Sequence, residues 1–156
     1  MEEKEIKQKC LKLMETADAV YLSTVDDKGF PQTRAMVNLR NKQQFQDIAK
    51  VFAEHEEDFV VYMTTDTASS KFKQVQANPK ASVYFCDPKE IKGLLLIGEV
   101  EVVTNRDIKH RLWQDDWKIY YPSGPDGPEY NILALHPKQV RCWFVPMPAP
   151  VEFKLK

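Results

Sequence analysis

The stretch from Phe59 to Phe85 constrains the fold of this chain more than any other. It begins with the apolar, β-branched run Phe59–Met63, continues through a hydroxyl-rich link that ends at Lys71, and closes with a second strand pattern, Ala81–Phe85. A short helix is expected between the two strands, and it ends at Asn78-Pro79. The apolar residues on one face of this helix are Ala68, Phe72 and Val75.

Lys71 falls in the first turn of that predicted helix, where a cation is mildly unfavourable because the helix dipole is positive at this end. Hydroxyl-bearing residues surround the same helix start: Thr64, Thr65, Thr67, Ser69 and Ser70. Free backbone N–H groups, hydroxyls and an ammonium together form a good site for an anion, most naturally a phosphate. Ordinary N-capping by Ser or Thr beside a solvated lysine explains the same pattern, so this stretch alone leaves both interpretations open.

A second candidate site residue lies in a predicted hairpin formed by Val20–Val25 and Gln32–Leu39. In the returning strand Arg34, Met36 and Asn38 share one face. A solvated sheet face explains an arginine in this place. The alternative is that Arg34 offers a planar fork to a phosphate while Asn38 bonds to a ligand ring.

The rest of the chain alternates strand patterns with short amphipathic segments. Helices are expected at about 4–16, 45–52 and after a cap at Thr104 or Asn105. Further strands are expected at 94–103, with a bulge or close approach at Gly98, and as a final pair, 131–135 and 139–145. An aromatic cluster, Trp117, Tyr120 and Tyr121, fits a core or a subunit interface better than a pocket.

This element pattern predicts a mainly β (α+β) fold, a closed antiparallel barrel with short helices at its ends. At 156 residues the chain fits one domain, residues 1–156. The net charge of −1 gives no field that would favour nucleic acid or an anionic membrane. Three distant cysteines predict reduced thiols and no metal site, and the absence of an apolar leader or span predicts a cytoplasmic protein.

From Arg34 through Phe85 the sequence resembles the pyridoxamine 5′-phosphate oxidase-like superfamily of FMN-binding split barrels, and more closely its general stress protein branch. The matching order is Pro31-x-x-Arg34-x-x-x-x-Leu39, the strand Val60–Thr65, Ser70-Lys71, Asn78-Pro79 with its strand, and Leu95–Gly98. The late segments Trp113…Trp117…Tyr121-Pro122 and Pro137…Trp143 are also similar to that branch.

The resemblance implies a homodimer of six-stranded Greek-key split barrels with FMN at the subunit interface. It implies that Arg34, Lys71 and Ser70 hold the FMN phosphate, and that Thr64 and Thr65 contact the ring or the ribityl chain. Trp143 would approach from the second subunit. The residues expected to run beside the isoalloxazine are Ala35, Met36, Val37, Asn38 and Leu39.

Two departures from the oxidases count against vitamin B6 as the substrate. Gly93 stands where the oxidases usually carry a flavin-contacting glutamine, and Pro146–Pro150 replaces their Arg-x-His segment. The sequence therefore predicts an FMN-dependent oxidoreductase acting on an unidentified small molecule, with no side chain assigned as catalytic. The alternatives are a non-catalytic protein that binds flavin, F420 or haem, and a stress-related dimer that has lost its ligand.

Overall fold

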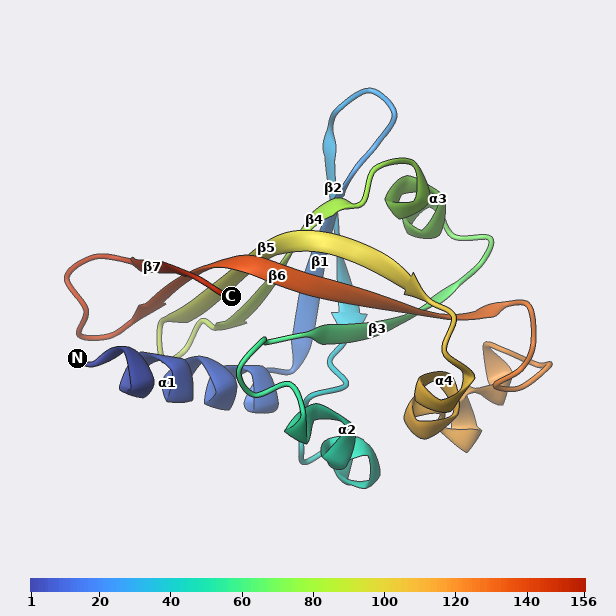
Figure 1. Cartoon of the computed structure of the whole chain (residues 1–156), viewed down its shortest axis with the longest axis horizontal. Coiled ribbons are helices and arrows are strands. Elements are labelled where there is room, and N and C mark those ends of the chain that lie inside the picture. The colour runs from blue at the N-terminus through green and yellow to red at the C-terminus, as the bar shows by residue number, and fades with distance from the viewer.

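The computed structural model describes residues 1–156, and an antiparallel sheet forms its frame (Figure 1). Six strands are hydrogen-bonded in the order β2-β1-β4-β5-β6-β3, and β7 pairs with β6. The strands are β1 (Ala19–Val25), β2 (Pro31–Val37), β3 (Val61–Asp66), β4 (Lys80–Asp87), β5 (Lys92–Val103), β6 (Tyr130–Phe144) and β7 (Val151–Lys154). The predicted mainly antiparallel α+β split-barrel fold is confirmed.

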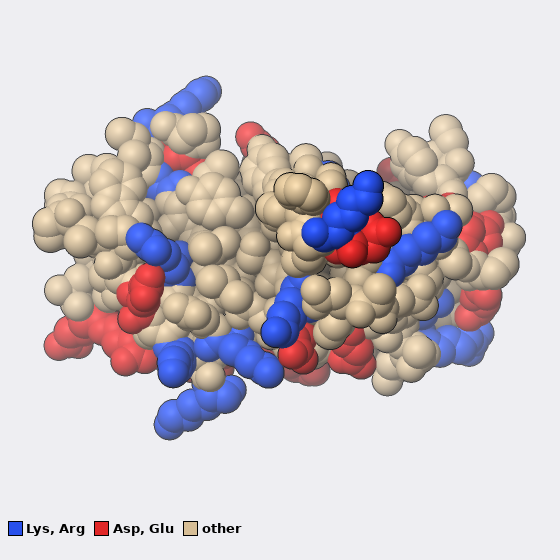
Figure 2. Space-filling view, turned by 90° about the horizontal axis from the view of Figure 1, so that it is seen from above, with Lys and Arg blue, Asp and Glu red and all other residues tan.

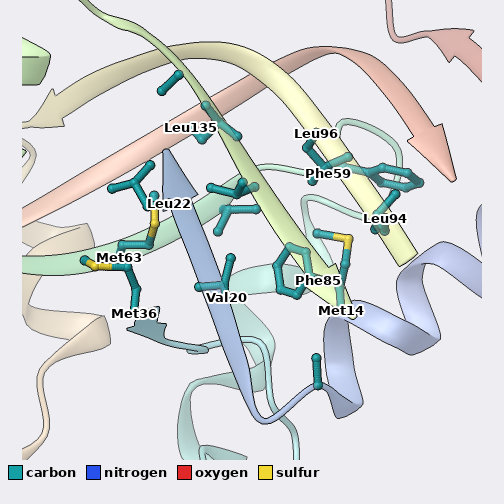
Figure 3. Close-up of a cluster of buried hydrophobic side chains, with 14 of the residues drawn as sticks. Met14, Val20, Leu22, Met36, Phe59, Met63, Phe85, Leu94, Leu96 and Leu135 are labelled. Carbon is teal, nitrogen blue, oxygen red and sulfur yellow. The ribbon is translucent and has the colours of Figure 1, made fainter. Parts of the chain in front are cut away.

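The barrel is not closed by hydrogen bonds, in contrast to the closed barrel that the strand pattern suggests. The end strands β2 and β3 share no backbone pairing. Side chains close this gap on the core side only, where Met36 of β2 and Met63 of β3 lie together (Figure 3). The gap leaves a split between the two strands, and hydroxyl and cationic groups gather along it.

Alternation along the strands divides the apolar residues between two cores. Inward side chains of all the main strands fill the barrel, including the fully buried Leu22, Phe85 and Leu96 (Figure 3). The outer face of β3 and of the adjoining part of β6 carries a second core, which contains Tyr62 and Ile132. Short helical segments cover this second core and leave the outer face of β2, β1, β4 and β5 without a cover.

The helices lie at the ends and over the second core (Figure 1). They are α1 (Glu3–Thr16), α2 (Ala49–Ala53), α3 (Ser70–Ala77) and α4 (Arg106–Leu112), with the 3-10 turns η1 (Gln46–Ile48) and η2 (Asp115–Ile119). Of the two predicted caps of α4, Thr104 and Asn105, the structure uses Asn105, whose side chain accepts a hydrogen bond from the backbone N–H of Ile108 at 3.1 Å. No helix combines the length and the apolar character needed to span a bilayer.

Two predicted strand boundaries are wrong. β2 ends at Val37 rather than Leu39, because the Asn38 side chain donates to the carbonyls of Met14 and Ala17 at the end of α1, at 2.8 and 2.9 Å. The final strand pair is instead one long strand, β6, that pairs with β5 along its length. The chain passes His136-Pro137 without turning, since a bulge opposite Gly98 absorbs the proline.

Among the glycines of the chain, Gly98 lies closest to neighbouring backbone atoms. A Cβ atom built on it would lie 2.1 Å from the carbonyl oxygen of His136. At Gly93 an added Cβ would meet only the end of the Tyr84 side chain, 2.3 Å from its hydroxyl oxygen. The first obstacle is backbone held in a ladder, whereas the second can rotate aside.

Gly98→Ala should therefore lower the free energy of unfolding by about 2–3 kcal/mol, as overpacking against fixed atoms does. Gly93→Ala is the control, and it should cost less. Urea denaturation of the two variants beside the wild type measures the difference. Equal stability of the two variants would contradict the account of the bulge.

Candidate functional site

The start of α3 combines the two features that the sequence left as alternatives. Ser69 caps the helix, since its Oγ accepts a hydrogen bond from the backbone N–H of Phe72 at 3.3 Å and lies 2.8 Å from Thr65 Oγ1. Lys71 in the first turn is half-buried and forms no ion pair. The capping interpretation is correct for Ser69, but the lysine beside it is not a freely solvated one.

Arg34 reaches toward the same helix from β2. Its Nη1 donates to Thr24 Oγ1 at 2.7 Å and more weakly to the carbonyl of Leu22 at 3.4 Å, and its Nη2 donates to Gln74 Oε1 at 3.2 Å. The side chain is half-buried and, like Lys71, has no carboxylate partner. A solvated sheet face therefore does not describe this position.

The two cations repel each other. Burial lowers the pKa of Lys71, and the positive charge of Arg34 lowers it further, while Asp66 has a weaker opposite effect. Burial also lowers the pKa of Arg34. Desolvated charges of one sign with no acidic partner are an unfavourable arrangement in the ligand-free protein. An anion between them would remove both penalties.

Lys71 lines an open groove of about 560 Å³ along the split between β2 and β3. One end is polar, and the other is bounded by apolar and aromatic side chains of β2 and the segment after η2. The lining residues are Ala35, Met36, Val37, Thr64, Thr65, Asp66, Ser69, Lys71, Ile119, Tyr120 and Tyr121. The groove thus offers a cationic and hydroxyl-rich end and an apolar wall to one elongated ligand.

The structure gathers most of the predicted site residues at this groove. Those that line it are Ala35, Met36, Val37, Thr64, Thr65 and Lys71. Arg34 lies close enough to Lys71 to lower its pKa, and Ser70 is the exposed first residue of α3. These residues come from three elements, β2, β3 and α3, that are separated in the chain.

Three predicted site residues lie elsewhere. Asn38 is buried and bonded to α1, and Leu39 packs in the second core. Trp143 lies near the opposite end of β6 from Ile132, which pairs with Thr64 beside the groove. Trp143 comes eleven positions after Ile132, on the order of 30 Å along β6, so it does not reach its own chain's groove.

Sequence reasoning missed several residues of the site. Thr24 and Gln74 bind Arg34, and Ile119 lines the groove while 79% exposed. Tyr120, for which the sequence favours a core or a subunit interface over a pocket, also lines the groove and is 69% exposed, so it is not part of the core. The sequence does contain a signal for Gln74. It lies three residues after Lys71, and residues at this spacing share one side of a helix, so it could be expected near the same site. Tyr121 packs in the second core and also lines the groove, so both the core and the pocket interpretation of the aromatic cluster are correct for this residue.

The groove borders an uncovered apolar face of the sheet, hereafter the outer face. Ala35, Tyr21, Tyr84 and Leu95 are successive partners across β2, β1, β4 and β5, and each points away from the barrel core. Other members of this face are Val37, Ile97 and Trp143. Charged groups of both signs are scattered over the surface seen in Figure 2, without a field of one sign.

The charge of Lys71 should destabilise the ligand-free protein. Lys71→Met is expected to raise Tm by on the order of 1–3 °C, whereas Lys73→Met, on the exposed side of the same helix, should not. Because folding lowers the pKa of Lys71 from its ordinary 10.5, the penalty is full below the lowered pKa and disappears as pH rises toward 10.5. Thermal melts across this alkaline window measure both effects. A larger loss of stability for Lys71→Met than for Lys73→Met would contradict the repulsion.

Comparison with known structures places the fold. A protein from Clostridium acetobutylicum related to general stress protein 26 of B. subtilis has a TM-score of 0.74 at 25% identity, over 98% of this chain and 96% of that one. A pyridoxamine 5′-phosphate oxidase-related, FMN-binding protein from Nostoc punctiforme gives 0.59 at 16% identity, over 97% and 90%. A haem-binding protein from Mycobacterium smegmatis gives 0.66 at 11% identity, over 95% and 57%.

The comparison with curated proteins returned no significant match. The family model described as pyridoxamine 5′-phosphate oxidase matches residues 6–144, which span every strand except β7 as well as the groove and the outer face. The two terminal segments outside the match are short. The chain therefore belongs to the pyridoxamine 5′-phosphate oxidase family.

Proposed function

We propose that the whole chain, residues 1–156, is a single FMN-binding domain and that the protein is an FMN-dependent oxidoreductase acting on a small molecule. The observation that carries the proposal is the pair of half-buried cations, Arg34 and Lys71, which have no acidic partner. A phosphate dianion would neutralise both charges. It would also lie at the N-terminus of α3, which begins at Ser70 and whose cap residue Ser69 lines the groove.

The groove suits the rest of an FMN molecule. Thr64 and Thr65 follow the polar end; Thr64 is partly exposed and offers its hydroxyl to a ribityl chain, while the buried Thr65 hydroxyl is bonded to Ser69. Ala35 and Val37 on one side and Tyr121 on the other form apolar walls for a flat ring. A ligand with a phosphate at one end and an aromatic ring at the other matches both ends of the groove. Cofactor pockets generally combine apolar walls with a few polar groups in this way.

The outer face supports a homodimer. The uncovered apolar row Ala35, Tyr21, Tyr84 and Leu95 ends at the Arg141–Glu152 ion pair, and an apolar patch rimmed by polar groups is typical of an interaction surface. Ala35 and Val37 belong both to this face and to the groove, so a second copy seated on the face would become a wall of the cofactor site. Trp143 lies on the same face, so in such a dimer its side chain could contact the groove of the partner subunit. We therefore propose two composite sites per dimer.

The protein's contribution to the reaction is binding and orientation. FMN, when bound, supplies the acceptance and transfer of a hydride or of electrons. The titratable groups along the groove are Asp66, Lys71, Tyr120 and Tyr121, and no histidine or cysteine lines it. Burial raises the pKa of Tyr121 above its ordinary value, which is already far above neutral pH, so its hydroxyl is protonated and can donate a hydrogen bond.

Haem binding is the less favourable alternative for this chain. The common axial ligand is histidine, and all three histidines are bonded to carboxylates away from the groove. His55 lies 3.0 Å from Asp58, His110 lies 2.7 Å from Asp126, and His136 lies 2.8 Å from Glu101. Non-catalytic flavin binding remains the second candidate function. The groove contains no titratable side chain apart from Asp66, Lys71, Tyr120 and Tyr121, and none of these is assigned as a catalytic acid or base.

A reduction assay separates the catalytic from the non-catalytic proposal. The protein loaded with FMN is mixed with NADH or NADPH in the absence of oxygen, and absorbance near the flavin maximum is followed. Rapid bleaching is the result expected for an oxidoreductase that uses a nicotinamide donor. A stable spectrum would assign the protein to flavin binding or to another donor. Failure of the apoprotein to bind FMN at all would refute the proposed cofactor.

Removing either cation should weaken FMN. A charge-assisted hydrogen bond contributes about 1.5–3 kcal/mol, so Arg34→Ala and Lys71→Ala should each raise the Kd for FMN roughly ten- to a hundredfold. Lys73→Ala is the matched control, because Lys73 lies on the same helix with its side chain exposed. Quenching of FMN fluorescence during titration measures each Kd. Unchanged affinity in both Arg34→Ala and Lys71→Ala would mean that the phosphate binds elsewhere.

A charge placed in the outer face should separate the subunits. Tyr84→Glu puts a carboxylate at the centre of the apolar row, opposite Tyr21 and Leu95. Sedimentation velocity is expected to detect a dimer for the wild type and a monomer for Tyr84→Glu with an unchanged circular dichroism spectrum. A wild-type protein that is monomeric at all concentrations, or a variant that stays dimeric, would argue against this face as the interface.

A further inference from the structure

We propose that Gln74 is a positioning residue that orients Arg34 so that one edge of the guanidinium remains free for a terminal phosphate. The inference rests on the proposed function, since it concerns the same phosphate site, and it adds a residue and a ligand preference to it. Gln74 itself is not required to touch the ligand. Its contribution is to fix the side chain that does.

The contacts form a closed ring of three side chains. Arg34 donates through Nη1 to Thr24 Oγ1 at 2.7 Å and through Nη2 to Gln74 Oε1 at 3.2 Å. The Thr24 hydroxyl in turn donates to the same Gln74 oxygen at 2.5 Å. Thr24 is fully buried in β1, so the ring is anchored in the body of the barrel.

The chemistry of the ring fixes the orientation of the Gln74 amide. A guanidinium only donates hydrogen bonds, so the atom that faces Arg34 must be the amide oxygen and not the nitrogen. The Thr24 hydroxyl accepts a hydrogen bond from Arg34 and donates one to the Gln74 amide oxygen. Each member of the ring therefore has a defined role, and a flipped amide would set its N–H groups against the guanidinium and break the bond to Arg34.

The ring occupies one edge of the arginine fork and leaves another open. Thr24 and Gln74 bind the Nη1 and Nη2 groups, and the weak third bond to Leu22 also uses Nη1. A guanidinium has five N–H groups, and those left without a protein partner are the Nε–H and one hydrogen of Nη2. These two can point in parallel, which is the geometry for bidentate binding of a phosphate.

Gln74 also connects the two cations mechanically. It lies on α3 one turn after Lys71, so its bonds to Arg34 and Thr24 tie the helix that carries Lys71 to β2 and β1. Two cations held in fixed positions suit a terminal phosphate with two negative charges better than a diester with one charge. The ring should therefore contribute specifically to the preference for FMN over riboflavin, which has no phosphate.

The test compares two ligands on two variants. Gln74→Ala in the full-length apoprotein should raise the Kd for FMN about three- to tenfold, the effect of a net hydrogen bond, and leave the Kd for riboflavin unchanged. Gln74→Glu should weaken FMN further, because its carboxylate pairs with Arg34 and neutralises it. Gln76→Glu adds the same charge to an exposed position of α3 and is the control.

The outcomes separate the inference from the proposed function. An equal loss for FMN and riboflavin in Gln74→Ala would mean that Gln74 only supports the fold, and it would overturn the inference. Unchanged FMN affinity in Gln74→Ala, with a loss in Arg34→Ala, would also overturn it while the proposed phosphate site stands. No loss of FMN in Arg34→Ala would refute the phosphate site itself.

Discussion

Repulsion between Arg34 and Lys71 across the split in the barrel is the interaction on which the candidate site depends. The two side chains come from β2 and α3, and each is partly withdrawn from water without an acidic partner. Proteins normally pair such charges or leave them in solvent. Here the barrel holds them together, so the ligand-free site stores an unfavourable energy that binding of an anion would release.

The topology explains how the two cations meet. β3, α3 and β4 follow one another in the chain, but β3 and β4 lie at separate places in the sheet order β2-β1-β4-β5-β6-β3. The link between them must therefore cross the end of the barrel, and α3 does so beside β1 and β2 (Figure 1). The same open order leaves β2 and β3 unpaired, and the groove follows that gap.

Local patterns in the sequence predict most of the fold because alternation and helical spacing determine which face of each element is buried. The same patterns find Lys71 and Arg34, since a cation at a helix start or in mid-strand is a local anomaly. They fail for Asn38, which looks like a ligand group but caps the distant α1, and for the break at His136-Pro137, which a bulge opposite Gly98 absorbs. They also miss the ring of Thr24, Gln74 and Arg34, because its members meet only through the tertiary fold.

The charge state of the bound phosphate tests the central claim most directly. Phosphorus NMR of FMN on the protein can follow the phosphate resonance as pH falls. A free phosphomonoester gains its second proton with a pKa of about 6. Two fixed cations favour the dianion, so the account predicts a bound phosphate that stays dianionic well below that pH. A bound phosphate that titrates near pH 6, as in free solution, would contradict the claim that Arg34 and Lys71 hold it.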